Sequence, residues 1–281
     1  MQITMNPNSE LNQSAVNVPE VVQVPERLIA EAKRFQEAMM MYTCAIREVK
    51  TKLEVLNDEL SIKNQRNPIE MIKSRVKKPS SIVEKLQRRN LEVSVDSMMA
   101  NLDDIAGIRV ICSFVDDIYA VSEMLTGQDD IKVIAIKDYI KNPKPNGYRS
   151  YHMILEVPVF FSSGKTPMRV EVQVRTIAMD FWASLEHKIY YKFEGNAPDY
   201  LEQELKACAD MADMLDNKMF SLNQAITKIA EEQAKEKEAA KVAEKMKKAE
   251  REDVPAGNEQ EPKDGKRSGE AASGNRKEAG E

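Results

Sequence analysis

Acidic residues that could hold a divalent cation occur in two short apolar segments of the chain. In DDIAGIRVICSF, Asp104 precedes a strand pattern that contains Arg109. In RVEVQVRT, alternation places Glu171, Gln173 and Arg175 on one face of a strand and valines on the other. A carboxylate at a strand edge is a common ligand for the metal ions that accompany nucleotide phosphates. Each segment alone would also suit an ordinary strand, so the site hypothesis depends on further motifs.

A run of basic residues lies upstream of these carboxylates. Residues 73–89, KSRVKKPSSIVEKLQRR, hold seven basic residues and one acidic residue. The basic side chains that share one side of an extended stretch, and then one face of a helix over 80–90, are Arg75, Lys77, Lys85, Arg88 and Arg89. A helix N-terminus beside such a stripe suits a polyphosphate, whereas a solvated basic face is the simpler alternative. Ser81 and Glu84 have capping-box spacing, which predicts that the helix starts at Ser81.

A turn rich in polar and aromatic residues forms the fourth motif. Residues 144–152, KPNGYRSYH, contain one of only two histidines in the chain and lead into a strand pattern. Tyr148 could stack on a nucleobase, and Arg149 and His152 could bind phosphates or a sugar hydroxyl. A single histidine in such a place more often makes a structural hydrogen bond. A plain hairpin would need the Asn-Gly pair and none of the other residues.

Together these motifs resemble the synthetase domain of the RelA/SpoT homologues, and specifically the small alarmone synthetases of the RelQ type. The segments that carry the resemblance are RVKKPSSIVEKLQRR, DDIAGIRVICSFVDDIY, NPKPNGYRSYH and VEVQVRTIAMDFWASLEHKIYYK. The resemblance covers about 68–193 closely and the flanking helices to about 225 loosely. It implies a GTP pyrophosphokinase, which moves the β,γ-diphosphate of ATP to the ribose 3′-hydroxyl of GDP or GTP. The products would be ppGpp or pppGpp and AMP.

The resemblance also assigns roles to individual residues. The residues expected to bind ATP are Arg75, Lys77, Ser81, Lys85, Arg88 and Arg109, with Arg89 as the alternative to Arg88. The residues expected to bind the guanine nucleotide are Lys144, Asn146, Tyr148, His152 and Gln173. Arg75 and Arg109 would sandwich adenine, and Tyr148 would stack on guanine. Asp104 and Glu171 would hold Mg²⁺, with Glu171 as the general base and His152 as its rival.

The pattern of the middle of the chain predicts a mixed α/β (α+β) fold. Its sheet would be of the nucleotidyltransferase-like type, flanked by helices and by long N- and C-terminal helices. Strands are predicted at 105–114, 131–137, 150–159 and 168–175, and further helices at 80–90, 116–125 and 176–193. The last of these helices carries an apolar face formed by Ile177, Phe181, Leu185 and Ile189.

The long N-terminal helix carries a heptad seam. Its apolar positions are Leu28, Ala32, Phe35, Met39, Tyr42, Ile46, Val49, Leu53, Leu56 and Leu60. Such a seam predicts a partner helix, either the C-terminal stretch 198–231 or the same helix of a second subunit. The family resemblance implies a homotetramer.

Composition divides the chain into a core and its accessories. The expected segments are a flexible 1–24, an N-terminal helix 25–66, a catalytic core 67–195, a C-terminal helical region 196–231, and a charged helix fraying into a disordered tail 232–281. The net charge is −5, so any anion site must be a local cluster. No signal peptide or membrane span is expected, and three scattered cysteines favour the cytoplasm.

Other functions are weighed against this interpretation. Two histidines, neither followed by aspartate, argue against the metal-dependent hydrolase centre of the larger family members. A catalytically weak regulator that binds RNA or guanine nucleotides is the main alternative, although a pure binder would not need both carboxylates. A nucleotidyltransferase that moves AMP fits the fold type but not the four motifs. The resemblance further implies single-stranded RNA and (p)ppGpp as regulatory ligands.

Overall fold

The computed structural model describes residues 25–64, 66–191 and 198–252. The chain divides into two compact units, Met1–Asn223 and Gln224–Glu281. The first unit holds the sheet and every residue of the candidate site. In the second unit the described backbone is helical, and the described side chains are exposed. The segments expected to be flexible at 1–24 and beyond 252 lie outside the described residues.

A five-stranded mixed sheet forms the centre of the first unit. Its strands are β1 (Ile69–Val76), β2 (Ala106–Cys112), β3 (Lys132–Asp138), β4 (Tyr151–Phe161) and β5 (Gly164–Thr176), in the order β1-β2-β5-β4-β3. Only the β2–β5 pair is parallel. This confirms the predicted mixed α/β fold. Strand β1 was not among the predicted strands, because as an edge strand it exposes five of its eight residues and lacks an alternating apolar pattern.

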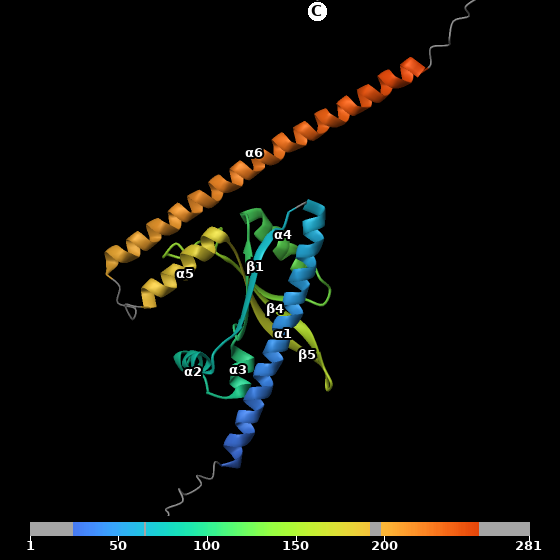
Figure 1. Ribbon diagram of the computed structural model, residues 1–281. Helices are drawn as coiled ribbons and strands as arrows, with labels where there is room; N and C mark the ends of the chain where they lie inside the picture. The colour runs from blue at the N-terminus through green and yellow to red at the C-terminus, as the bar shows by residue number, and fades with distance from the viewer. Residues whose placement is uncertain (1–24, 65, 192–197, 253–281) are drawn as a thin grey trace, which may run out of the picture. The chain divides into compact units, whose positions relative to one another are not determined.

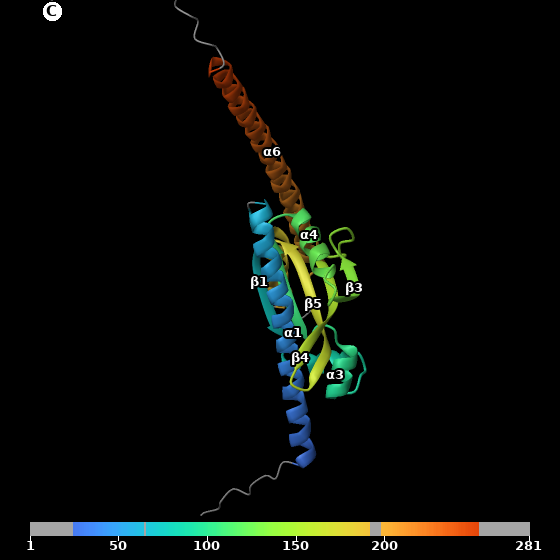
Figure 2. The same cartoon turned by 90° about the vertical axis from the view of Figure 1, so that its right-hand side faces the viewer.

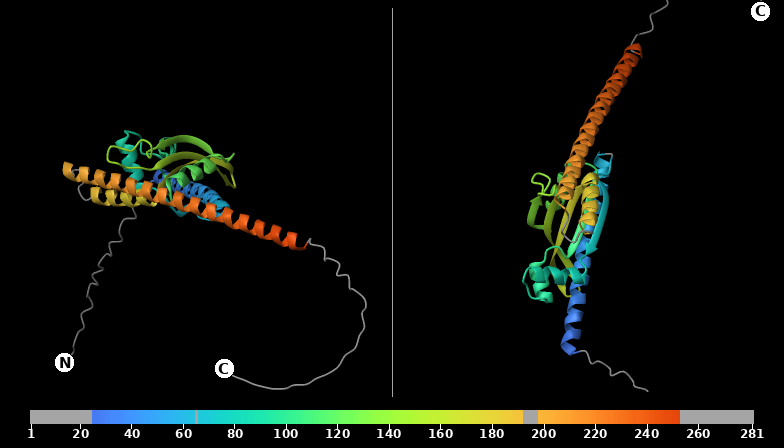
Figure 3. Two further views of the ribbon diagram at one scale, coloured as in Figure 1. Left: turned by 90° about the horizontal axis from the view of Figure 1, so that it is seen from above. Right: turned by 90° about the vertical axis from the view of Figure 1, so that its left-hand side faces the viewer.

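Six helices accompany the sheet in the described part of the chain. They are α1 (Glu26–Asn64), α2 (Pro79–Arg88), α3 (Val95–Asn101), α4 (Val115–Thr126), α5 (Ile177–Tyr191) and α6 (Asp199–Glu252). Helix α3 was not predicted; it is short and is capped by Ser94, whose side chain accepts a hydrogen bond from the Ser97 backbone. Figure 3 shows α5 running beside the first part of α6, where Trp182 donates to the Leu205 carbonyl at 2.8 Å.

Helix α1 packs on the sheet, which corrects the predicted helix–helix pairing. Its seam from Tyr42 to Leu60 is buried in the same core as the valines of β5, and α1 lies across the strands in Figures 1 and 2. Leu53 is fully buried there, whereas Leu28, near the start of the helix, is 59% exposed. A heptad stripe and a sheet-packing stripe have nearly the same period, so the sequence could not distinguish the two partners.

One local expectation is also wrong, and the exposure of one helix face was not predicted. Helix α2 has Lys78 as its N-cap without a side-chain hydrogen bond, and Pro79 at its first position, so Ser81 and Glu84 form no capping box. Proline is preorganised for the first helical turn, which explains the earlier start. In α5 the predicted apolar face is exposed, and the buried positions are Met179, Trp182 and Ala183.

None of the helices among the described residues is long and apolar enough to cross a membrane.

Candidate active site

The face of the sheet opposite α1 carries two rows of candidate residues across neighbouring strands. In the first row Arg75 pairs with Gly107, and Gly107 pairs with Glu171. In the second row the register is Lys73, Arg109, Gln173 and His152 across β1, β2, β5 and β4. Alternation explains the arrangement, because each of these positions is offset by one from the buried residues that face α1.

A cavity of about 230 Å³ opens over these rows. Its lining residues are Lys73, Ser74, Arg75, Asp104, Gly107, Ile108, Arg109, Glu171 and Gln173. Gly107 contributes no side chain, so the floor between Arg75 and Glu171 stays open. Four residues predicted for the ATP and metal sites therefore line one cavity, together with Gln173, which was predicted for the guanine nucleotide.

Asp104 lies between two lysines at the edge of this cavity. Its Oδ2 accepts hydrogen bonds from Lys77 Nζ at 2.9 Å and from Lys85 Nζ at 2.6 Å. Burial alone would raise the pKa of Asp104, but the two lysines outweigh burial and hold that pKa below its ordinary value. Asp104 is therefore ionised, with two candidate phosphate ligands already beside it.

The second oxygen of Asp104 suits a cation. Within the part of the chain that the structure describes, Oδ1 is buried and has no hydrogen-bond partner. No group of three or more His, Cys, Asp or Glu side chains that could hold a metal occurs among the same residues. Mg²⁺ usually takes only one or two protein carboxylates and completes its octahedron with water and substrate phosphates. Asp104 and Glu171 fit that pattern.

Glu171 is also held as a carboxylate. Burial would raise its pKa, but His152 and Gln173 outweigh burial and lower it below the ordinary value. Gln173 Nε2 donates to Glu171 Oε2 at 2.9 Å, and His152 Nδ1 lies 3.4 Å from Oε1. The negative charge of Asp104 opposes this lowering, so the two carboxylates interact electrostatically.

The hydrogen-bond directions around His152 follow from chemistry. A nitrogen that faces a carboxylate must carry a proton, because a lone pair there would be repelled. Nδ1 of His152 is therefore the donor toward Glu171. On the other side of the ring, Nε2 lies 2.8 Å from the hydroxyl of Tyr148. Both ring nitrogens thus have partners, which leaves Glu171 better placed than His152 to accept a substrate proton.

Tyr148 is supported from several sides. Its backbone N–H donates to Asn146 Oδ1 at 3.2 Å, and Lys144 Nζ lies 4.6 Å from the ring centroid. Tyr139, which sequence reasoning missed, packs edge-on against both Tyr148 and His152. A stacked guanine would share the ring with Lys144 or displace it. The predicted guanine-binding residues Lys144, Asn146, Tyr148, His152 and Gln173 therefore form one connected group.

Gly147 allows the loop to approach α6. Its φ is +87°, and a Cβ at this position would lie 2.6 Å from Cβ of Ala209. Arg149, which could have bound phosphate, instead pairs with Asp210 and Asp213 of α6 at 3.3 and 3.2 Å. Arg149 thus fastens the loop and does not line the cavity.

The residues of helix α2 that were predicted to bind phosphates do not line the cavity. Lys85 reaches Asp104, but Ser81 lies in the first turn of α2 and Arg88 is exposed in its last turn. Arg89 donates to the Asn101 carbonyl at 2.8 Å, a structural contact that favours Arg88 as the free phosphate ligand. Neither Ser81 nor Arg88 lines the 230 Å³ cavity.

Two further residues tie this group together: Arg175, which the sequence suggested only as a candidate phosphate ligand, and Asp180, which had no predicted role. Arg175 is 3% exposed and donates to the Tyr148 hydroxyl at 2.6 Å and to Gln173 Oε1 at 2.8 Å. Asp180, in the first turn of α5, accepts hydrogen bonds from Arg109 and Arg175. The available signal was the alternation that placed Arg175 on the face of Glu171; an acidic residue in a first helical turn is too common to be informative.

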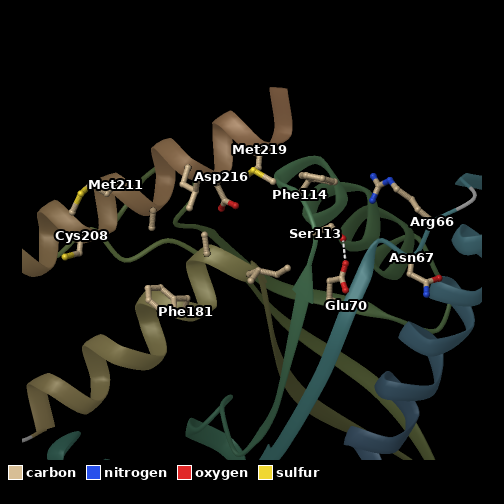
Figure 4. Close-up of a pocket in the computed structure, with 14 residues that line it drawn as sticks. Arg66, Asn67, Glu70, Ser113, Phe114, Phe181, Cys208, Met211, Asp216 and Met219 are labelled. Carbon is tan, nitrogen blue, oxygen red and sulfur yellow. Dashed lines mark hydrogen bonds between the residues drawn. The ribbon is translucent and has the colours of Figure 1, made fainter. Parts of the chain in front are cut away.

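A larger cavity lies elsewhere in the described part of the chain. A groove of about 1030 Å³ runs between α5 and α6 and reaches the start of β1, with Phe181, Met211, Leu215 and Met219 among its apolar lining residues. Figure 4 shows Phe181 on α5 and Met211 and Met219 on α6, with Phe114 and Glu70 on the side of the sheet. None of the predicted site residues lines it. Its apolar lining suits a protein surface better than a nucleotide.

Comparisons with known proteins agree with this architecture. A family model described as a region found in RelA / SpoT proteins matches residues 74–196. The GTP pyrophosphokinase YwaC of Bacillus subtilis is 44% identical over 192 residues, which cover 68% of this chain and 91% of that protein. The GTP pyrophosphokinase YjbM of the same organism is 37% identical over 190 residues, which cover 68% of this chain and 89% of that protein.

Solved structures show the same fold. The small alarmone synthetase 2 of Bacillus subtilis matches with a TM-score of 0.62 and 44% identity, over 68% of this chain and 98% of that one. The small alarmone synthetase 1 of Bacillus subtilis, bound to its product pppGpp, matches with a TM-score of 0.65 and 36% identity, over 69% and 99%. The chain therefore belongs to the RelA/SpoT family and, within it, to the small alarmone synthetases.

Proposed function

We propose that this chain is a GTP pyrophosphokinase that transfers the β,γ-diphosphate of ATP to the ribose 3′-hydroxyl of GDP or GTP. The products are ppGpp or pppGpp and AMP, the alarmones of the stringent response. The relatives YwaC and YjbM are GTP pyrophosphokinases. The observation that carries the proposal is that one cavity unites two ionised carboxylates, Asp104 and Glu171, with Arg75 and Arg109.

On the donor side, basic residues bind and orient ATP. Arg75 and Arg109 lie on the neighbouring strands β1 and β2 and line the cavity together, so their guanidinium planes are available to adenine. Lys77 and Lys85 bind the phosphates, with Ser81 and Arg88 at the α2 end of the site. A transfer between two polyanions requires mainly positioning and charge neutralisation, which these cations supply.

On the acceptor side, the residues around Tyr148 hold the guanine nucleotide. Tyr148 stacks on the base, and Lys144, Asn146 and Gln173 offer polar contacts. Glu171 accepts the proton of the 3′-hydroxyl, because its carboxylate is kept ionised by His152 and Gln173. His152 orients Glu171 and is itself oriented by Tyr148.

Mg²⁺ is the cofactor that these residues fit. Asp104 and Glu171 would hold it, and the unpartnered Oδ1 of Asp104 is the atom that favours this assignment. A bound Mg²⁺ would neutralise charge on the transferred phosphates. Lys77 and Lys85 keep Asp104 ionised until substrate phosphates draw them away.

The proposal is tested by incubating purified protein with ATP, Mg²⁺ and either GDP or GTP, and separating the products by charge. We expect AMP and a guanine nucleotide with two additional phosphates. A silent nucleotide-binding regulator would give no product. Incubation of ppGpp with the protein and a divalent metal should release no pyrophosphate, and its release would show a hydrolase activity that we do not expect.

We also propose that the chain forms a homo-oligomer, a homotetramer by the family resemblance. The support is the exposed apolar face of α5, including Phe181 at 65% exposure, beside the groove to α6. Light scattering after size exclusion should give about four times the 31.9 kDa chain mass. Phe181→Asp should lower that mass, whereas Ile62→Asp, at an exposed apolar position outside the groove, should not. Deletion of residues 254–281 should leave the number of chains in the assembly unchanged.

Regulatory ligands follow from the same resemblance. We propose (p)ppGpp and single-stranded RNA as candidates, each to be checked by equilibrium binding to the purified protein without ATP. Binding of (p)ppGpp that survives Tyr148→Ala would separate a regulatory site from the acceptor site.

A further inference from the structure

Asp180 is a shared counter-ion for basic residues of three neighbouring strands. Its Oδ1 accepts hydrogen bonds from Arg109 at 3.0 Å and from Arg175 at 3.3 Å. Its Oδ2 lies 3.6 Å from Lys73 Nζ. The side chain of Asp180 is only 13% exposed, so these contacts are partly shielded from solvent. One carboxylate thus links β1, β2 and β5 to the start of α5.

Arg175 extends this link toward the acceptor loop. Its guanidinium donates to Asp180, Gln173 and the Tyr148 hydroxyl, and its Cζ lies 5.1 Å from the Tyr148 ring centroid. A buried guanidinium needs a counter-charge, and Asp180 supplies it. Because the guanidinium is a rigid planar fork, the position of Asp180 fixes the direction in which Arg175 meets Tyr148.

We infer that Asp180 and Arg175 are a positioning pair that holds Arg109 and Tyr148 in one fixed arrangement. The inference rests on the proposed roles of Arg109 beside adenine and Tyr148 beside guanine. Asp180 contacts Arg109 directly and Tyr148 only through Arg175. The pair therefore couples the two nucleotide half-sites without touching either nucleotide.

This coupling has a chemical purpose. The reaction joins a terminal diphosphate of one nucleotide to the ribose of another, so both nucleotides must be held in register. Two half-sites on separate elements could shift independently of each other. A carboxylate shared by residues of both half-sites limits that movement.

The test measures KM for ATP and for GTP in Asp180→Asn, alone and combined with Arg109→Ala or Tyr148→Ala. Alone, Asp180→Asn should raise both KM values by about five- to tenfold, which corresponds to the net loss of one typical hydrogen bond. In the Arg109→Ala background it should no longer raise the KM for ATP but should still raise that for GTP. In the Tyr148→Ala background the pattern should be reversed.

Asp117→Asn is the matched control for a merely structural effect. Asp117 is also a poorly exposed carboxylate in the first turn of a helix, and it accepts two hydrogen bonds from Arg66, outside the cavity of Asp104 and Glu171. Its loss should lower the melting temperature and leave both KM values unchanged. Asp180→Asn should change both KM values even if it lowers the melting temperature no more than Asp117→Asn does.

Three results would overturn the inference. Asp180→Asn could lower the melting temperature and leave both KM values within about twofold, an effect that surface polar contacts alone give. Asp180→Asn could raise each KM by the same factor in the wild-type, Arg109→Ala and Tyr148→Ala backgrounds, which would show no specific coupling. Finally, Arg109→Ala and Tyr148→Ala could themselves leave the KM values unchanged. That last result would refute the site assignment, and with it the coupling, while wild-type alarmone formation would still support the proposed function.

Discussion

Lys85 donates a hydrogen bond of 2.6 Å to Asp104, and Lys77 donates to the same oxygen, so two proposed phosphate ligands directly contact a proposed metal ligand. The two lysines neutralise the carboxylate, and the carboxylate keeps the lysines from solvent. Binding of a nucleotide with its cation would replace these contacts by equivalent ones, lysine to phosphate and Asp104 to metal. The charged groups of the proposed site therefore already lie in paired positions.

The two carboxylates should both be essential for synthesis. Asp104→Asn and Glu171→Gln each remove one negative charge from the proposed metal site without a large change in shape. Each should reduce turnover to less than about a tenth of the wild-type value, a loss above ~1.4 kcal/mol in transition-state stabilisation. Circular dichroism and light scattering should show that the fold and the assembly persist. A variant that keeps more activity would remove its residue from the metal site.

Tyr148 should act on the acceptor and not on ATP. Tyr148→Ala removes a base stack that is worth about 1–3 kcal/mol, so the KM for GTP should rise roughly tenfold or more. Tyr148→Phe keeps the ring and loses only the hydroxyl contacts with His152 and Arg175. It should therefore raise the KM for GTP less than Tyr148→Ala does, because the stacking ring remains. Equal effects on both substrates would show that the loop does not distinguish the two half-sites.

Stability should depend on the ionisation of Asp104. The pKa of Asp104 is lower in the folded protein than its ordinary value of 3.8, so its contribution is present above that pH. The contribution is lost as the pH falls through the lowered pKa. Asp104→Asn should lower the free energy of unfolding by about 1–3 kcal/mol at pH 7, and this deficit should shrink below about pH 4. Urea unfolding of both proteins across this pH range measures the deficit. A deficit that grows in acid would contradict the prediction.

Gly147 should be required for the acceptor loop. In Gly147→Ala the alanine must adopt the left-handed conformation that Gly147 has, which costs about 1–2 kcal/mol. Its Cβ would also overlap Ala209, and such overpacking typically costs about 1–3 kcal/mol. Gly164→Ala is the matched control, because Gly164 also has a positive φ, of +120°, but its Cβ would have nothing within 4 Å. Gly147→Ala should therefore lose more stability and raise the KM for GTP, and equal losses in both variants would contradict the packing argument.

Much of the fold could be predicted from local patterns. The alternation of Glu171, Gln173 and Arg175 with valines predicted both strand β5 and the face that carries the candidate site. The partner of α1 could not be predicted, because the stripe that buries Leu53 has the same spacing for a sheet as for a helix. The apolar face of α5 was predicted, but its exposure was not, for a related reason. Periodicity identifies an apolar face but not whether the same chain covers it.

The candidate site was predictable only in part. Motif resemblance named five of the nine residues that line the cavity, namely Arg75, Asp104, Arg109, Glu171 and Gln173. It gave no contact between Asp104 and the lysines, and no role for Tyr139 or Asp180, because these contacts join segments far apart in the chain. The pairing of Arg109 with Asp180 depends on where α5 starts relative to β2, which is a tertiary property.

The most direct test of the account follows the phosphates of ATP through one turnover. Protein, Mg²⁺ and GTP are incubated with ATP labelled at either the γ- or the α-phosphate, and the labelled products are separated by charge. The account predicts γ-label in a guanine nucleotide with two added phosphates and α-label in AMP, with less than about a tenth of either signal from Asp104→Asn. The appearance of γ-label in free pyrophosphate and α-label in the guanine product would show AMP transfer and contradict it.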